Sequence, residues 1–518
     1  MSGVESRRWS GYDRLWTRWE VWGLAQLAAP PRMRGGTGLA VGAASLLAAA
    51  FFAVAWIEYR GIYQGQEVIG IFLSWLYHIA VLGQVDPHGA VAWPMLADNL
   101  GLDWYPLALL YRLYPHALTL FVVQAAGLAA VLLLVYLVWR RERRSDRRIF
   151  WLLPLVAVSP ALWGADLFPG HPDFLIPVGI LWAHHHYLGR RRLDGAGLLP
   201  LLLALGAKEA AALPVAAYGS YLWLKYRDRG GLWIMALGGA WLAGATLVLT
   251  AWHVGRIDHF TRIYAALLGG RHGLAAGASF VLTHPWVPIA VLFSGSRMLA
   301  LAAYLVPLAG LPLAGRAALP GAAVLVVFNL LSSRLPQVFG IWEYGLWPLP
   351  LLLLGAMDGL ARVQWRRGWR WGVILGGAGA TAWLVLSLQV FLAPHAGASA
   401  QWRLLLQLRA RPRASVAAES ALTPYLANRP HLTQLPALAG AQAMAAAIRR
   451  SGARWALLGS PPAAITAALG RAGYVPVRQA GGTWAYRREG VAHGPQGGRD
   501  LERADEHSVA PLARPPDG

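Results

Sequence analysis

Cysteine is absent from the sequence, and charged residues are scarce. None of the 518 residues is a cysteine, which excludes disulfide bonds, thiolate metal sites and a cysteine nucleophile. Charged residues make up 14% of the chain and hydrophobic residues 56%, whereas an ordinary soluble domain carries about 25% charged residues. The chain therefore lacks the charge that would cover a soluble surface of its size.

The scarcity of charge also leaves long gaps between charged residues. Among the stretches that contain no Asp, Glu, Lys or Arg are residues 37–57, 116–138, 231–251 and 371–393. A helix needs about 20 apolar residues to cross the roughly 30 Å hydrocarbon core of a bilayer, and each run reaches that length. We therefore predict an all-α polytopic membrane protein. Its first run is expected to be a retained span rather than a cleaved signal peptide, because no small-residue cleavage site follows it.

Basic residues gather between the hydrophobic runs. In a soluble protein the net charge of +21 would suggest binding to nucleic acid, but this distribution is that of cytoplasmic loops, so we expect membrane lipid and no nucleic acid as the partner. With every basic cluster in the cytoplasm, the chain has about eleven transmembrane helices in the inner or plasma membrane, a cytoplasmic N-terminus and an outer C-terminus. The expected spans are 37–57, 116–138, 149–166, 173–188, 196–208, 210–225, 231–252, 296–315, 317–332, 341–361 and 371–393.

Two stretches of the sequence are each compatible with two structures. Residues 196–225 form either a hairpin of two short helices or one kinked helix, and residues 276–295 form either a re-entrant helix or a surface helix. An apolar stretch at 68–82, inside the long outer loop 58–115, is too short to span the bilayer and suits a helix lying on the membrane surface.

The predicted domain organisation has four parts. A cytoplasmic segment, 1–36, precedes the transmembrane domain, 37–393; a small α/β domain follows outside the membrane at 397–490, and a disordered tail rich in Gly, Pro and charge occupies 491–518. Within the α/β domain we expect strands at 415–419 and 455–459, helices at 441–450 and 463–471, and a hairpin of 474–478 with 483–487.

Two acids of the outer loop are the candidate catalytic residues. Asp103 lies where the loop re-enters the bilayer, and Glu67 precedes the apolar stretch of the loop. A carboxylate at such a position can act as a general base on an acceptor hydroxyl. The alternative is that both acids belong to an ordinary polar loop.

A short outer turn contains the candidate metal ligands. Asp166, His171 and Asp173 fall within eight residues, and two carboxylates with an imidazole can hold a divalent cation such as Mg²⁺ or Mn²⁺. The alternative is a Pro/Gly turn in which Asp173 caps the next helix.

Ionisable residues interrupt two apolar stretches. Lys208 and Glu209 lie within 197–223, and Glu343 lies near the outer end of a late span. An ionisable group at the centre of a membrane costs about 2.5–3.5 kcal/mol, so such groups usually face a polar cavity or one another. Adjacent positions on a helix do not face each other. We therefore expect separate partners for Lys208 and Glu209, and we favour a substrate-binding role for all three residues over the alternative of a purely structural one.

The order of these features resembles the predicted-membrane-protein family known as domain of unknown function 2079, over most of residues 58–490. The segments that carry the resemblance are 68–72, 103–106, 111–115 with Gln124, 159–160, Phe168 with 171–173, 208–209, 422–426 and 428–430. The chain departs from the family where Glu67, Trp104, Asp173 and Glu343 stand in place of the Asp, His, Glu and His that are more usual there.

The resemblance implies a function, because this family is similar in architecture to the GT-C class of glycosyltransferases. Such enzymes take sugars from polyprenyl-phosphate donors, carry an acid in the first outer loop and often have an outer C-terminal domain; some need a divalent metal. The resemblance implies that Asp103 or Glu67 is the general base, that Lys208 and Arg112 neutralise the donor phosphate, and that His171 and Asp173 bind metal or phosphate.

Two other functions fit the same residues. A transporter or lipid flippase would place Lys208, Glu209 and Glu343 along a path through the membrane, and a non-catalytic scaffold would bind a partner through the C-terminal domain. A transporter needs polar groups with access to both membrane faces, whereas a transferase gathers them at one face beneath the soluble domain. The sugar, the acceptor, the need for a metal and the oligomeric state stay open at this point.

Overall fold

The computed structural model describes most of the chain. It covers residues 36–62, 67–91, 93–98, 100–143, 147–252, 263–265, 267–270, 274–362, 367–392, 398–435 and 440–489. The expected N-terminal segment, apart from Gly36, and the expected tail 491–518 lie outside the described residues.

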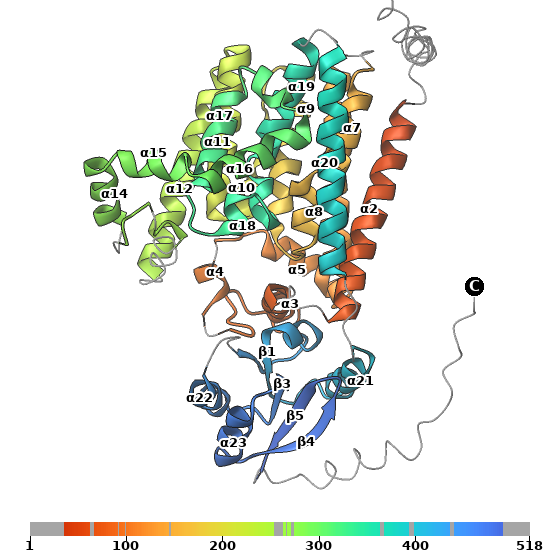
Figure 1. Cartoon of the computed structure of the whole chain (residues 1–518), viewed down its shortest axis with the longest axis vertical. Coiled ribbons are helices and arrows are strands. Elements are labelled where there is room, and N and C mark those ends of the chain that lie inside the picture. The colour runs from red at the N-terminus through yellow and green to blue at the C-terminus, as the bar shows by residue number, and fades with distance from the viewer. Residues whose placement is uncertain are drawn as a thin grey trace, which may run out of the picture.

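The described chain forms a helical bundle with a small domain at one end (Figure 1). The uncharged runs form its longest helices, because a helix lets an apolar chain satisfy its own backbone hydrogen bonds. These are α2 (Gly36–Gly61), α6 (Ala117–Arg143), α12 (Gly230–Trp252) and α20 (Arg367–Phe391). Shorter helices complete the bundle: α7 (Ile149–Ala157), α8 (Pro160–Asp166), α9 (Leu175–Arg190), α10 (Gly195–Gly206), α11 (Ala212–Tyr226), α16 (Gly295–Leu305), α17 (Leu319–Leu330) and α19 (Leu349–Arg362).

The chain is a multi-pass membrane protein, although the number of spans depends on how short helices are counted. Among the described residues, five helices are long and apolar enough to cross a membrane, or up to seven if two sharply bent pairs each count as one span. Every one of the eleven expected spans overlaps a helix. However, α10 and α17 have 12 residues each, and at about 1.5 Å per residue they do not cover the hydrocarbon core alone. Helix length therefore confirms a polytopic fold but not the count of eleven.

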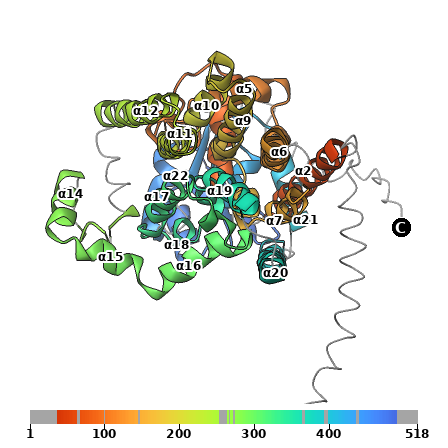
Figure 2. The same cartoon turned by 90° about the horizontal axis from the view of Figure 1, so that it is seen from above.

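A break in the helices decides the first of the two open alternatives. Residues 196–225 form two short helices, α10 and α11, which are separated by the short 3-10 helix η3 (Glu209–Ala211). In the second stretch, α14 (Leu274–Thr283) and α15 (Trp286–Leu292) project sideways from the bundle (Figure 2).

A five-stranded sheet forms the core of the C-terminal domain. The strand order is β2-β1-β3-β5-β4; β1 pairs with β2 and β3 in parallel, whereas β5 pairs with β3 and β4 antiparallel. The expected strands and helices are present, and β2 with the 3-10 helix η7 (Ser420–Tyr425) was not expected. The bounds are α21 (Ala398–Arg409), β1 (Val416–Glu419), β2 (Leu432–Leu435), α22 (Ala441–Ser451), β3 (Trp455–Gly459), α23 (Ala463–Arg471), β4 (Tyr474–Ala480) and β5 (Thr483–Arg488).

The two faces of this sheet bury different partners. Successive side chains of a strand point to opposite faces, and Ala417 accordingly packs with Met444 and Ile448 of α22. Val416 and Ala418 instead belong to an apolar core that continues into the membrane-facing helices. The domain is therefore joined to the bundle by a shared hydrophobic core.

The helix α3 (Glu67–Ala80) lies at this junction rather than only on a membrane surface. It packs against α5 (Trp104–Leu113) and η7, and it lies between the bundle and the domain (Figure 1). An added Cβ at Gly70 would overlap the Thr423 side chain. The absence of a side chain at residue 70 therefore lets the backbone of α3 approach η7 closely.

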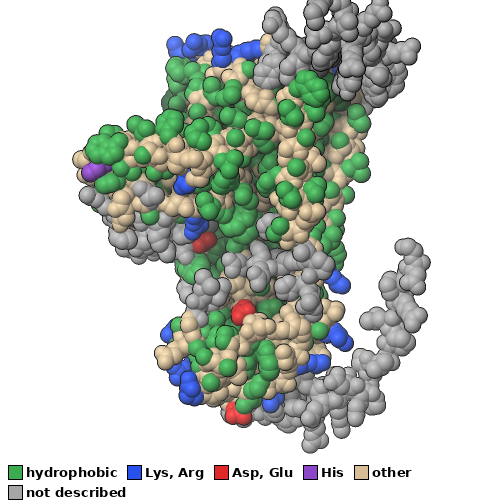
Figure 3. Space-filling view, in the orientation of Figure 1, with side chains coloured by type: hydrophobic (Ala, Val, Ile, Leu, Met, Phe, Trp, Pro, Cys, Tyr) green, Lys and Arg blue, Asp and Glu red, His purple; other side chains and the backbone are tan. Residues whose placement is uncertain are grey.

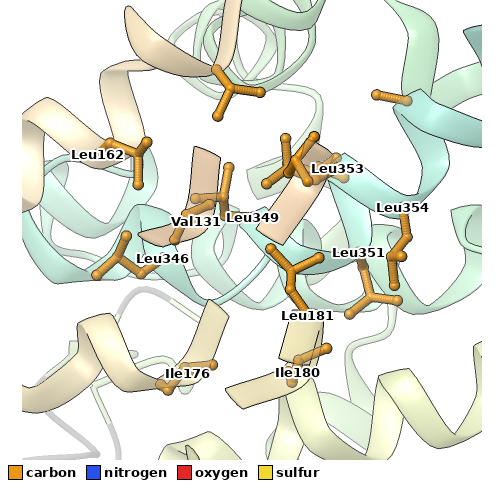
Figure 4. Packing of buried hydrophobic residues seen from close by; sticks show 14 of the residues in the cluster. Val131, Leu162, Ile176, Ile180, Leu181, Leu346, Leu349, Leu351, Leu353 and Leu354 are labelled. Carbon is orange, nitrogen blue, oxygen red and sulfur yellow. The ribbon is translucent and has the colours of Figure 1, made fainter. Parts of the chain in front are cut away.

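Basic side chains gather at the other end of the bundle, away from the C-terminal domain, and also on the domain itself (Figure 3). The last turns of α6 and α9 carry Arg140, Arg141, Arg143 and Arg190. The interior between the two ends of the bundle is apolar, with leucine and isoleucine side chains of α8, α9 and α19 packed together (Figure 4).

Replacing Gly70 with Ala tests the docking of the domain. Overpacking of this kind costs about 1–3 kcal/mol, so we expect a lower midpoint of thermal unfolding and faster proteolysis of the C-terminal domain in the full-length protein. The matched control is Gly38→Ala, where an added Cβ meets nothing within 4 Å. Equal behaviour of the two variants would contradict the close packing of α3 on η7.

Candidate functional site

A buried ammonium group lies where α10 ends. Lys208 has an extended backbone (φ −170°, ψ 169°) between α10 and η3, and its side chain is only 8% exposed. Its Nζ lies 3.3 Å from Asp173 Oδ1 and 3.9 Å from Glu343 Oε1. The break in the helix thus carries the lysine to two carboxylates that are distant in sequence.

Short 3-10 helices position both carboxylates. Asp173 lies in η2 (Pro172–Phe174) and Glu343 in η6 (Trp342–Leu346). The Trp347 indole donates a hydrogen bond of 2.7 Å to Asp173 Oδ1, and the Lys208 ammonium lies 5.2 Å from the centroid of the same indole ring. The aromatic ring therefore fixes Asp173 and offers Lys208 a cation–π contact.

His171 completes what we call the Lys208 cluster: His171, Asp173, Lys208 and Glu343. Its Nδ1 lies 3.9 Å from Asp173 Oδ2 and 3.9 Å from Glu343 Oε1. Burial, followed by the nearby Lys208 charge, lowers the pKa of His171 to about 3, so the imidazole is neutral at pH 7. Phe168 stacks on this ring and Phe72 of α3 meets it edge-on.

Asp103 lies just before α5, against the end of α10 that leads into Lys208. Its backbone N–H donates a 3.1 Å hydrogen bond to the Gly206 carbonyl, two residues before Lys208. An added Cβ at Gly206 would overlap the Asp103 carboxyl, so this glycine lets the acid approach. Burial raises the pKa of Asp103 to about 7, which suits a group that takes up a proton near neutral pH.

Glu209 has a partner of its own. Its Oε2 accepts a 3.1 Å hydrogen bond from the Leu100 backbone N–H, whereas Lys208 turns to Asp173 and Glu343. The expected separate partners are therefore found, and Glu209 holds the outer loop rather than joining the cluster.

Several buried polar atoms here have no hydrogen-bond partner among the described residues: Asp103 Oδ2, His171 Nε2, Asp173 Oδ2 and Glu343 Oε2. An unsatisfied buried polar atom costs about 1–3 kcal/mol, and native proteins keep few of them. Their concentration at one place indicates a site that a polar ligand completes. Carboxylate oxygens accept hydrogen bonds, so a ligand rich in hydroxyl groups fits them.

The structure does not bring the three predicted metal ligands, Asp166, His171 and Asp173, together. Among the described residues, no group of three His, Asp or Glu side chains could hold a metal ion. The buried Asp166 carboxyl interacts electrostatically with Glu58 of α2, and the space between Asp173 and Glu343 is taken by the Lys208 ammonium. This arrangement does not fit a divalent cation held by Asp166, His171 and Asp173, so no step below is routed through one.

Two further predicted site residues, Arg112 and Glu67, are not part of the Lys208 cluster as the structure describes it. Arg112 is exposed on α5, whose buried face is formed by Trp104, Leu107 and Tyr111. Glu67 begins α3, but its side chain lies outside the described residues.

The aromatic side chains that surround the site were not predicted from the sequence. Besides Phe72 and Trp347, Trp342 stacks on Phe168 with 4.4 Å between ring centroids. Trp342 has a left-handed backbone (φ 61°), which is rare outside glycine and clusters at functional sites. The signal in the sequence was the tryptophan before Glu343, but the chain has 26 tryptophans and this one does not stand out among them.

A second polar cluster, also not predicted, lies on α6, α11 and α19. Lys225 Nζ lies 2.8 Å from Glu142 Oε1 and 2.7 Å from Asp358 Oδ1, and it donates to Tyr221 at 2.7 Å. These contacts are short and the three charged groups have no unpaired buried atoms among the described residues. We interpret this Lys225 cluster as a structural link between α6, α11 and α19, in contrast to the loosely held Lys208 cluster.

Comparison with known proteins gives a matching family and similar solved structures. The profile of a family described as predicted membrane protein (DUF2079) matches residues 69–445, and a search of curated proteins finds no match. ArnT from Cupriavidus metallidurans in the apo state is similar with a TM-score of 0.48 and 14% identity, over 86% of this chain and 98% of that one. Arabinofuranosyltransferase AftD from Mycobacteria is similar with a TM-score of 0.42 and 14% identity, over 86% of this chain and 39% of that one. Because these scores and identities are low, the two likenesses carry no argument about activity.

Replacing Lys208 with Met is expected to lower the free energy of unfolding by about 3–5 kcal/mol, because it leaves buried carboxylates without their counter-charge. Denaturant unfolding of the full-length protein in detergent measures the loss. Adding Glu343→Gln to Lys208→Met should restore part of the stability by removing one of those charges. The exposed Arg190→Met is the control; a loss no larger than the control's would contradict the ion-pair assignment.

Proposed function

The chain belongs to the DUF2079 family of predicted membrane proteins, and we propose that it is a GT-C-like glycosyltransferase that takes a sugar from a polyprenyl-phosphate donor at the outer face of the membrane. The observation that carries this proposal is the Lys208 cluster beside Asp103, a buried set of unpaired hydrogen-bond acceptors around one ammonium group. The architectural resemblance to GT-C enzymes supports it.

The ligand chemistry follows from the groups that are left unpaired. A sugar presents several hydroxyl donors, which match the free oxygens of Asp173 and Glu343 and the neutral His171 ring. A phosphate group needs a cation, and Lys208 supplies it within the same cluster. The aromatic rings of Phe72 and Trp347 add apolar surface beside these polar groups.

In the proposed reaction the acceptor hydroxyl attacks the anomeric carbon of the donor sugar. Asp103 accepts the hydroxyl proton as that C–O bond forms. The bond between the anomeric carbon and the phosphate oxygen breaks, and its electron pair leaves on the polyprenyl phosphate. Lys208 stabilises the charge on that leaving group. Glu67 stays the alternative base until it is tested by substitution.

The apolar interior of the bundle favours a transferase over a transporter. On α9, Ile176, Ile180 and Leu181 are fully buried between the Lys208 cluster and the far end of the helix, and leucines of α19 pack against them (Figure 4). A transporter requires a polar path that reaches both faces. An apolar layer therefore separates the Lys208 cluster from the Lys225 cluster, which supports chemistry at one face.

The proposed topology places the Lys208 cluster and the C-terminal domain outside the cell, with eleven spans and a cytoplasmic N-terminus. The basic residues at the opposite end of the bundle support this orientation (Figure 3). The short helix α10 is compatible with it, because its C-terminal end, where the helix breaks, is buried in protein.

Replacing Asp103 with Asn tests the proposed base. Removing a general base lowers the rate by about 10²–10⁴-fold, so we expect the variant to fail to restore the glycan profile of a strain that lacks the chromosomal copy. Glu67→Gln is tested in parallel as the alternative base. If both variants restored the full profile, the proposed function would be wrong.

The pH profile separates a catalytic role of Asp103 from a structural one. A base is active only when deprotonated, and the pKa of Asp103 is raised to about 7 by burial. Transfer by membranes that contain the wild-type protein should therefore rise as the pH increases through about 7. The residual activity of Asp103→Asn should lack this rise; an identical pH profile in both proteins would assign the rise to another group.

Single cysteines test the proposed topology, since the chain has none of its own. Gln442→Cys, exposed in the C-terminal domain, should react with a membrane-impermeant maleimide in intact cells. Arg192→Cys, exposed after α9, should react only after the cells are opened. The reverse pattern would place the Lys208 cluster in the cytoplasm and contradict transfer at the outer face.

A further inference from the structure

A second candidate site lies at the seam between the bundle and the C-terminal domain, in a small pocket that is partly open to solvent. None of its lining residues belongs to the Lys208 cluster. It is lined from the bundle side by α2, α3, α5 and the start of α6, and from the domain side by α21, η7 and the turn that follows. The polar lining residues are Tyr59, Tyr111, His116, Arg409, Asn428 and Arg429.

Arg409 gives the pocket its charge. Among the described residues no carboxylate lies within ion-pair distance of its guanidinium, although it acts electrostatically on Tyr59, Tyr111 and His116. Arg429 differs, because it donates to the carbonyls of Leu426, Ala414 and Leu408 and so holds the domain together. Arg409 is thus the cation of this pocket that lacks an anion.

Two hydrogen-bond donors accompany Arg409. His116 Nδ1 accepts a 3.1 Å hydrogen bond from the Leu118 backbone N–H, and in that tautomer the proton is on Nε2, which is free to donate. Ala117, which lines the pocket, begins the 27-residue helix α6, whose N-terminal N–H groups carry a partial positive charge. An anion would meet complementary groups from both sides of the seam.

The pocket also lies at the end of a span. The candidate span of α2 ends at Gly61, and the Arg60 guanidinium lies 5.7 Å from the ring of Trp56 and 5.1 Å from that of Trp402. Tryptophan is enriched at the membrane–water interface, which is the depth of lipid phosphates. Tyr111 and Asn428, which hydrogen-bond to each other across the seam at 2.5 Å, come from segments singled out in the sequence analysis and not used by the proposed reaction.

We propose that this pocket binds a phosphate group, with Arg409 as its principal ligand and His116 as a second donor, and that the bound phosphate fastens the C-terminal domain to the bundle. The phosphate comes either from a lipid head group or from solution. The proposal does not depend on the transferase activity, because its ligands lie outside the Lys208 cluster.

Binding is measured on the full-length protein in detergent with three probes: dimyristoyl phosphatidic acid, dimyristoylglycerol and inorganic phosphate. We expect the phosphate-bearing lipid to bind and to raise the midpoint of thermal unfolding, and the neutral lipid to do neither. Arg409→Gln should weaken binding by about tenfold to a hundredfold, the loss for a hydrogen bond to a charged group. Arg403→Gln, exposed on the same helix and outside the pocket, is the matched control.

The probes distinguish the source of the phosphate. Binding of phosphatidic acid alone identifies a lipid head group, and equal binding of inorganic phosphate identifies a soluble ligand; both support the site. Arg409→Lys keeps the charge and should retain part of the affinity, which separates loss of the ligand from loss of folding. Wild-type affinity in both Arg409→Gln and His116→Gln, or no phosphate-dependent rise in the unfolding midpoint, would overturn the proposal.

Discussion

The ion pairs of Lys208 organise the candidate site. They join three segments that are far apart in sequence, with Nζ 3.3 Å from Asp173 Oδ1 and 3.9 Å from Glu343 Oε1. Each polar member lies at a break in a helix: Asp103 before α5, Asp173 in η2, Lys208 before η3 and Glu343 in η6. Irregular backbone at membrane depth is tolerated only where it is buried in protein or lines a cavity. The helix breaks therefore need the buried site around them, and the site needs the breaks to bring its polar side chains together.

The C-terminal domain closes this region. Its η7 packs on α3, and Phe72 of α3 in turn meets the His171 ring edge-on. Excluding water lowers the effective dielectric constant and strengthens charge interactions, which is the condition under which Asp103 acquires its raised pKa. The difference between the two lysine clusters follows the same physics: the Lys225 contacts are short and satisfied, whereas the Lys208 cluster keeps unpaired oxygens for a ligand.

Composition and the uncharged runs were sufficient to predict a polytopic fold, because the need to satisfy backbone hydrogen bonds in lipid leaves helices as the way to use runs such as 116–138. Lys208 and Glu343 could be singled out because ionisable groups in an apolar stretch are costly. Sequence spacing could not show that Asp166, close to His171 in the chain, turns toward Glu58. It also could not reveal Trp347, Phe72 or the Lys225 cluster, since aromatic residues and basic loops are common throughout the chain and their roles depend on tertiary packing.

Above all, we propose that a lipid-linked sugar binds at the Lys208 cluster. The most direct measurement is a cryo-EM structure of the full-length chain in a lipid nanodisc with a polyprenyl-phosphate-linked sugar. The account predicts phosphate density within ion-pair distance of Lys208 Nζ and sugar density against Asp173 and Glu343, with the lipid tail leaving sideways into the bilayer. Ligand density elsewhere, or density that crosses the apolar layer around Ile180 toward Lys225, would contradict it.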